Sequence, residues 1–197
     1  MTVGIAFSFW YERPMKERLA LCLLGAWLMG SLMMFAVAPQ NFYVIDHLLE
    51  SSPNARFHAL AAELGPGSLR ECLRYLASEL NRTFFLQWNV LQVVLGGAVV
   101  WLCWQRQVRP RPKVPALAAM FHVALLLGVI TPLITRVGRS LDFVPRAPAP
   151  PQLSTFQLAH VAYTLLDVLK VLCVGVATVL LLRTHKGDLQ EQHRSAS

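Results

Sequence analysis

Four long apolar segments constrain this chain more than any other feature of its sequence. They cover residues 19–38, 84–104, 115–135 and 156–182, and the first of them holds twenty residues without a charged side chain. A helix of about twenty residues, rising about 1.5 Å per residue, is long enough to cross the hydrocarbon core of a bilayer. We therefore predict an all-α integral membrane protein, a four-transmembrane-helix bundle.

The composition of the chain agrees with four membrane spans. Only 15% of its 197 residues are charged, whereas a soluble domain normally carries about a quarter. The four spans and their connections use almost the whole length, so residues 1–197 are expected to form a single membrane domain. Ala36-Val37-Ala38 resembles a signal-peptide cleavage site, but the apolar run is long and Pro39 follows directly, so we expect a retained helix.

The formal net charge of +7 does not indicate nucleic-acid binding, because Lys and Arg gather at the ends of apolar segments and no recognition module accompanies them. These residues instead predict the topology. Ten of them lie in the head, the connection 105–114 and the tail, whereas seven lie on the other side, four of these in the long connection after the first span. Because basic residues near span ends favour the cytoplasm, both termini should be cytoplasmic.

The polar stretch 40–83 is predicted to contain an amphipathic surface helix between spans 1 and 2. Ser68 precedes Glu71 by three residues, a capping box that starts a helix running to about Asn81. Leucines recur along it at helical spacing, at positions 69, 73, 76 and 80. This stripe should pack on the membrane surface or the end of the bundle. The tail 183–197 is expected to be disordered.

The fourth span carries an unusual set of polar residues. His160, Tyr163, Thr164, Asp167 and Lys170 recur at intervals of three and four, so they lie on one face of a helix. Charges inside a membrane helix are expensive, at about 2.5–3.5 kcal/mol each, and pairing Asp167 with Lys170 removes most of that cost. The pair could be an internal ion pair that fixes helix packing, or part of a proton or substrate site.

Depth arguments bring polar residues from three spans together. Asp167 should lie ~16 Å below the outer end of its span, and His122 ~10 Å from the inner end of the third span. Asn89 and Gln92 descend to ~8 and ~12 Å in the second span. The candidate polar core therefore comprises Asn89, Gln92, His122, His160, Asp167 and Lys170.

No cofactor is predicted. His122 and His160 should differ by ~14 Å in depth, too far to bind one haem iron from opposite faces. One His and one Asp make a poor metal site, and the four cysteines show neither a C-x-x-C pair nor zinc-ligand spacing. The sequence also contains no phosphate-binding loop and no signature that pairs a nucleophile with a base.

Several short motifs resemble those of the uncharacterised transmembrane protein 205-like family. They are the end of the first span from Gly30 to Phe42 (GSLMMFAVAPQNF), Thr131-Pro132 with Arg136, and the phrase from Phe156 to His160. The insertion 50–81 departs from the compact connection of that family. The resemblance implies a four-helix membrane domain without an established activity. The anthrone oxygenase-like membrane proteins have a similar outline, and their enzymatic members leave an enzyme possible.

Three functions stay open. The leading hypothesis is an accessory or structural subunit of a membrane assembly, because catalytic motifs are missing and a surface helix suits contact with a partner. The expected partners are membrane lipid and either other membrane protein subunits or further copies of the chain. A small transporter or proton-coupled carrier could use the polar core, although no internal repeat is visible. A membrane enzyme acting on a hydrophobic substrate, with His122 or His160 as base, is the third.

Overall fold

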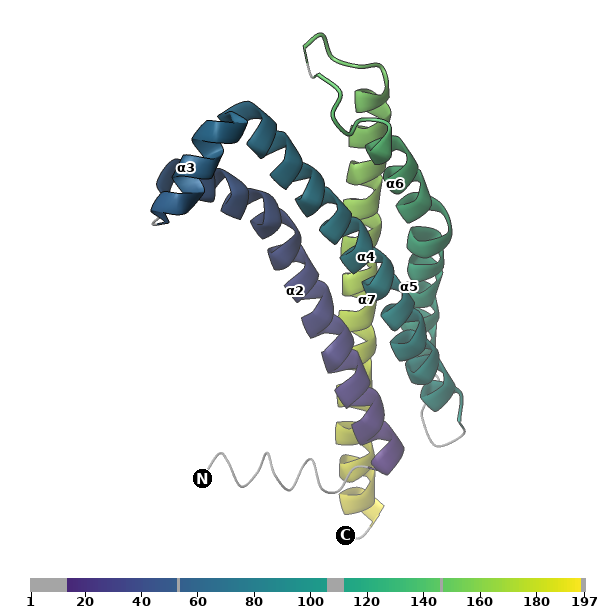
Figure 1. Cartoon of the computed structure of the whole chain (residues 1–197). Coiled ribbons are helices and arrows are strands. Elements are labelled where there is room, and N and C mark those ends of the chain that lie inside the picture. The colour runs from purple at the N-terminus through teal and green to yellow at the C-terminus, as the bar shows by residue number, and fades with distance from the viewer. Residues whose placement is uncertain (1–13, 53, 106–111, 146, 196–197) are drawn as a thin grey trace.

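The chain forms long helices that lie side by side in a bundle, as a computed structural model shows (Figure 1). The structure describes residues 14–52, 54–105, 112–145 and 147–195. The helices are α2 (Met15–Ser51), α3 (Ala55–Leu64), α4 (Pro66–Trp104), α5 (Lys113–Leu125), the π-helix η1 (Leu126–Ile130), α6 (Thr131–Arg139) and α7 (Gln152–Ser195). Helix α2 packs against α4 and α7, and α5 packs against the same two helices.

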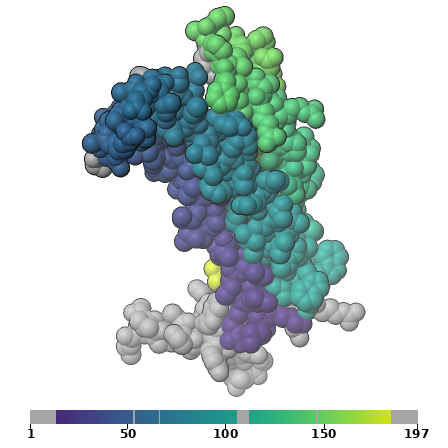
Figure 2. All heavy atoms as spheres, in the orientation of Figure 1, coloured from purple at the N-terminus to yellow at the C-terminus, as the bar shows by residue number. Residues whose placement is uncertain are grey.

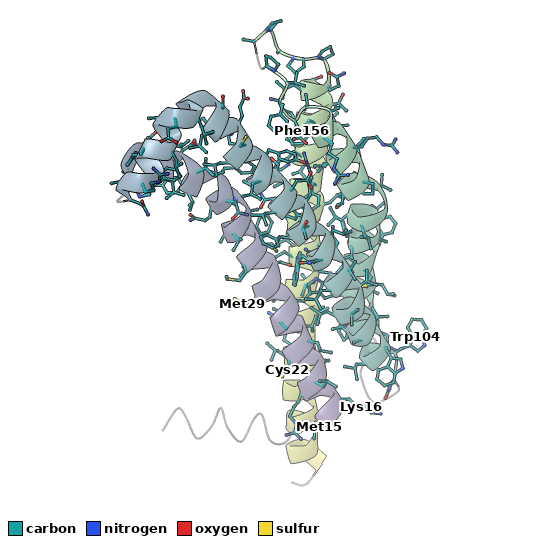
Figure 3. All side chains as sticks on the ribbon, in the orientation of Figure 1. Met15, Lys16, Cys22, Met29, Trp104 and Phe156 are labelled. Atoms are coloured by element: carbon teal, nitrogen blue, oxygen red, sulfur yellow. The ribbon has the colours of Figure 1, made fainter. Side chains whose placement is uncertain are left out.

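Four helical stretches are long and apolar enough to cross a membrane, which confirms the predicted four-helix membrane bundle. They are Met15–Ser51, Gly67–Trp104, Lys113–Arg139 and Gln152–Arg183, and each contains one predicted span. Large apolar side chains cover their outer surfaces. Met29 and Trp104 point away from the bundle (Figure 3), with 62% and 65% of their surfaces exposed. Such surfaces suit contact with lipid, so the chain is a multi-pass membrane protein.

The apolar core occupies the part of the bundle where α2 begins and α7 ends. Its buried members include Leu24, Trp27, Val99, Val123 and Leu181. Two glycines allow helices to approach closely: a Cβ added at Gly30 would lie 2.1 Å from the Trp88 ring, and one at Gly96 would lie 2.1 Å from the Met120 sulfur. The first and last helices start and end at the same end of the bundle, as four crossings require (Figure 1). Which end faces the cytoplasm remains a prediction.

The first and second spans extend far beyond their apolar segments. Helix α2 has 37 residues and continues through Pro39 to Ser51, so it is ~55 Å long. Proline has no N–H to donate and its ring clashes with the preceding turn, so it kinks or breaks a helix, and a helix that continues through it needs support from its neighbours. Asn81 supplies such support from α4, since its Nδ2 donates to the Ala38 carbonyl oxygen at 3.0 Å and its Oδ1 accepts from Asn41 at 2.6 Å.

The segment predicted as a surface helix is helical but is not separate. Helix α4 begins at Pro66, after Gly65 with a φ of 81°, and runs unbroken to Trp104, so Ser68 is not its cap. The short helix between the two spans is α3, capped by Asn54, whose side chain accepts from the amides of Arg56 and Phe57. The leucine stripe is only partly packed against this chain: Leu69 and Leu73 are half-buried, whereas Leu76 and Leu80 are 55% and 40% exposed.

Residues 40–83 form a bent hairpin that we call the arm. It contains the end of α2, all of α3 and the beginning of α4, and it leans away from the neighbouring end of α7 (Figures 1 and 2). Inside the arm, Ile45 and Ala77 are buried. Two ion pairs join its helices, from Arg70 and Arg74 to Asp46 at 3.4 and 3.6 Å.

Two further predictions concern the ends and the turn. The tail was expected to lack regular structure, but helix α7 continues to Ser195, so this expectation is wrong for residues 183–195. The segment directly follows a long helix, so continuing it avoids the cost of starting a new one, and about half of its residues have good helix propensity. The predicted basic turn 105–114 lies mostly outside the described residues, as do most of the head and residues 196 and 197.

Candidate functional site

Polar side chains from four helical segments meet inside the apolar bundle. Eight of them are buried: Trp27 and Ser31 of α2, Asn89 and Gln92 of α4, Thr131 of α6, and Tyr163, Asp167 and Lys170 of α7. The Ser31 hydroxyl has no hydrogen-bond partner among the described residues. Because a buried polar group without a partner costs free energy, the contacts among these residues decide what the cluster can do.

Four of them form a continuous hydrogen-bond chain across three segments. Trp27 Nε1 donates to Gln92 Oε1 at 2.9 Å. Gln92 Nε2 then donates to Asn89 Oδ1 at 3.1 Å, and Asn89 Nδ2 donates to Thr131 Oγ1 at 2.9 Å. Each amide is thus both donor and acceptor. This hydrogen-bond chain fixes the rotation of α2, α4 and α6 relative to one another, because turning any of these helices would leave a buried polar group unpaired.

Helix α7 adds an aromatic hydroxyl and an ion pair. The Tyr163 hydroxyl lies 3.5 Å from Asn89 Oδ1, and its ring meets Phe85 edge to face at 5.2 Å between centroids. One turn further along, Lys170 Nζ donates to Asp167 Oδ1 within the same helix. Lys170 has no exposed surface. The predicted pairing of Asp167 and Lys170 is therefore present in the structure.

A π-helix places Thr131 within this cluster. In η1 the amide of Thr131 donates to the Leu126 carbonyl, five residues earlier. The next residue, Pro132, has no N–H, so the ladder of backbone hydrogen bonds is irregular here. The extra residue in a π turn rotates the following residues around the helix axis. Gly128 lies within this π-helix and Pro132 follows it by two residues.

The two histidines of the predicted core are placed differently from the other four candidates. His122 is half-buried, and its Nδ1 lies 2.7 Å from the Ala118 carbonyl oxygen of its own helix. His160 is exposed and stacks on Phe156 with 5.9 Å between ring centroids. Among the described residues, neither ring has a hydrogen bond to the buried amides or to the ion pair. Asn89, Gln92, Asp167 and Lys170 all lie in the buried cluster.

Four buried residues of the cluster are not among the predicted core candidates: Trp27, Ser31, Thr131 and Tyr163, of which only Tyr163 belongs to the polar face predicted for the fourth span. Trp27 and Thr131 lie within apolar runs, and Ser31 lies among small and apolar residues. A tryptophan in the middle of a membrane helix carries an N–H that needs an acceptor, so Trp27 at the depth of a span centre could have been recognised. Thr131 follows an irregularity that only the backbone geometry shows.

Above the hydrogen-bond chain lies a cavity of about 130 Å³. Thr131 of the hydrogen-bond chain and Tyr163 beside it line the cavity, and the aromatic rings of Phe42, Phe85 and Phe156 line much of the remainder. A mostly apolar cavity with a few polar groups is the usual form of a small-molecule site. His160 also lines it, with its ring nitrogens outside the hydrogen-bond chain.

A second hollow, which we call the α4–α6 groove, is open and has a volume of about 560 Å³. Its lining residues are Glu79, Arg82, Thr83, Leu86, Leu127, Thr131, Pro132, Thr135, Arg136 and Arg139. Arg82 is held on both sides: it pairs with both carboxylate oxygens of Asp142 at 2.9 Å and with Glu79 at 2.5 Å. These ion pairs tie α4 to the loop that precedes α7.

The described side chains offer little for catalysis or metal binding. Within the described ranges, no group of three or more His, Cys, Asp or Glu side chains could hold a metal ion. Ser51 Oγ lies 3.0 Å from His47 Nδ1, but it also lies 3.0 Å from the His47 carbonyl oxygen, an ordinary contact at an exposed helix end. A nucleophile needs a base oriented by a third group, and we find none there.

The comparisons with known proteins assign no family. No protein-family model matches the chain, and no curated protein or solved structure is similar to it. The resemblance to the transmembrane protein 205-like family stays a prediction based on short motifs.

Proposed function

We propose that this protein is a non-catalytic accessory or structural subunit of a membrane assembly, and that it docks its partner through the arm. The observation that carries this proposal is the apolar outer surface of the arm. Its large exposed side chains are Tyr43, Val44, Leu60, Leu64, Tyr75, Leu76 and Leu80, each 39–69% exposed. They lie outside the predicted spans 19–38 and 84–104, so we expect a partner protein rather than lipid tails to cover them.

The arm is stiff enough to present this surface in one shape. Arg74 pairs with Asp46 and also lies over the Phe42 ring at 5.5 Å from its centroid. Tyr75 meets Phe143 of the loop before α7 at 5.0 Å between ring centroids. Preorganised surfaces lose less conformational freedom on binding. Tyrosine and apolar anchors on a helix face fit recognition of a partner helix or groove.

The buried cluster supports a structural role for the interior. The four side chains of the hydrogen-bond chain bind one another, and Asp167 and Lys170 bind each other. Internally satisfied networks specify a packing arrangement and leave few groups available to a substrate.

Native mass measurement in mild detergent tests the proposal. The wild-type chain should co-purify with a protein in fixed stoichiometry, either another subunit or a second copy. The double variant Leu76→Glu/Leu80→Glu, which places charges on one exposed face of α4, should lose this partner and keep its helix content and melting temperature. Ser68→Glu adds a charge to the same arm at an exposed polar position and should retain the partner. A strictly monomeric wild type without any bound protein would contradict the proposal.

A carrier is the second candidate, because the cavity lined by His160 and Tyr163 adjoins the buried cluster. A carrier that moves protons through the ion pair predicts that Asp167→Asn abolishes proton flux into liposomes and leaves folding nearly unchanged. The structural role predicts that wild type and variant give the same background flux.

A further inference from the structure

The α4–α6 groove changes from apolar to basic along its length. Leu86, Leu127 and Pro132 line it within the predicted spans, whereas Arg136 and Arg139 lie just beyond the end of the third span. The helices run in opposite directions here, and a 3.4 Å contact between Arg139 and Glu79 matches the levels of their two helices. The groove therefore crosses the boundary between hydrocarbon and headgroups, where lipid phosphates lie.

The arginines of the groove differ in what they already bind. Arg82 is engaged by Asp142 and Glu79, and its side chain is only 13% exposed. Arg136 is exposed and has no hydrogen bond or ion pair to any of the described residues. Arg139 has one long contact to Glu79, with 62% of its side chain exposed. Two guanidinium groups thus have free donors, and their planar geometry matches phosphate oxygens.

We propose that the α4–α6 groove binds one anionic phospholipid, with its phosphate at Arg136 and Arg139 and an acyl chain along Leu86 and Leu127. The lining holds three arginines and one glutamate, and Asp142 beside it neutralises Arg82, so one net positive charge remains, and it favours an anionic lipid over a zwitterionic one. The apolar half would have no role in binding a free anion. The groove is lined by Glu79, Arg82 and Thr83 of the arm but by none of the exposed apolar side chains that form the proposed docking surface, so the lipid site does not depend on the proposed docking function.

Native mass spectrometry tests whether the groove prefers an anionic lipid. The full chain in detergent is titrated with dioleoyl phosphatidylglycerol or dioleoyl phosphatidylcholine. Each arginine near an anionic lipid contributes about 1 kcal/mol, which corresponds to about a tenfold to thirtyfold change in affinity for two. Arg136→Gln/Arg139→Gln should weaken phosphatidylglycerol binding by that factor and phosphatidylcholine binding by less, because the choline group offsets the charge of its phosphate. The matched double variant Arg56→Gln/Arg183→Gln removes the same charge at exposed positions outside the groove and should bind like wild type. Equal losses in both double variants, or equal wild-type affinity for the two lipids, would overturn the proposal.

A neutral variant tests the apolar half. Leu86→Trp fills the groove from a half-exposed position without changing charge, so it should lower phosphatidylglycerol occupancy and leave the melting temperature unchanged. Millimolar inorganic phosphate should fail to displace the bound lipid. Displacement by phosphate would show a simple anion site, and unchanged occupancy in Leu86→Trp would show that the acyl chain lies elsewhere. Either result contradicts the lipid site.

Discussion

Removing one partner of the Asp167–Lys170 pair should strongly destabilise the fold, because neither group has access to water. Lys170 has no exposed surface and Asp167 is 6% exposed, and the two bind each other directly. Lys170→Met keeps the length of the side chain but leaves the carboxylate buried without its counter-charge. Breaking a buried pair in this way costs about 3–5 kcal/mol, and Asp167→Leu should cost a similar amount by isolating the ammonium.

Changing both residues together should recover most of this loss. Apolar replacement of a whole buried pair is often neutral or stabilising, by about 1–4 kcal/mol, so Asp167→Leu/Lys170→Met should unfold close to the wild type. The assay is reversible unfolding in mixed detergent micelles, followed by helix content. Single variants that unfold within about 0.5 kcal/mol of wild type, as surface substitutions do, would refute the burial of the pair. A double variant as unstable as either single variant would show that the pair stabilises the fold by more than the mutual neutralisation of its two charges.

The remaining predictions concern helix packing at glycines, the buried hydrogen-bond chain and the membrane topology. Gly96→Ala should destabilise the bundle by about 1–3 kcal/mol, whereas Gly97→Ala, whose Cβ would meet nothing within 4 Å, should be neutral or stabilising by up to about 1 kcal/mol; equal effects in unfolding experiments would contradict the packing argument. Trp27→Phe should cost about 1–3 kcal/mol because a buried amide oxygen of α4 loses its donor, and an unchanged melting temperature would refute this. Cysteines introduced at Gln105 and Ala149 should react with a membrane-impermeant reagent from opposite sides, the first from the cytoplasm; labelling of both from one side would exclude four crossings.

Hydropathy was sufficient to predict the spanning helices but not how far they extend. Pro39 and the polar residues that follow it are typical signals for the end of a helix. In the structure, the amide of Asn81 supports the helix at this point from α4, a contact between residues 43 positions apart in sequence. Local sequence signals contain no information about such a neighbour. The same reason explains why the segment beginning near Ser68 was read as a separate helix.

The depth of each residue along its helix axis predicted part of the buried cluster. It did not predict the direction in which each side chain points around that axis. Asn89, Gln92, Asp167 and Lys170 lie at compatible depths and are buried. His122 lies at a suitable depth too, but the buried stripe of α5 is Ala116, Ala119 and Val123. This stripe turns His122 to the side, because consecutive residues differ by about 100° around a helix.

His160 shares a face of α7 with Asp167, so periodicity placed it correctly around the helix. It is nevertheless exposed, because the bundle opens toward the arm and a cavity replaces close packing there. In the backbone view the arm leans away from the beginning of α7 (Figure 1). No pattern within a single segment predicts the angle between two long helices.

Photocrosslinking from the arm tests the proposed docking function most directly. A benzophenone amino acid in place of Leu76, at the exposed outer face of α4, is compared with the same residue in place of Val94, which is 63% exposed within the second span. We predict one discrete protein adduct from position 76 and only lipid adducts from position 94. Lipid adducts alone from both positions would mean that the arm lies against the membrane, and would contradict its role as a surface for a protein partner.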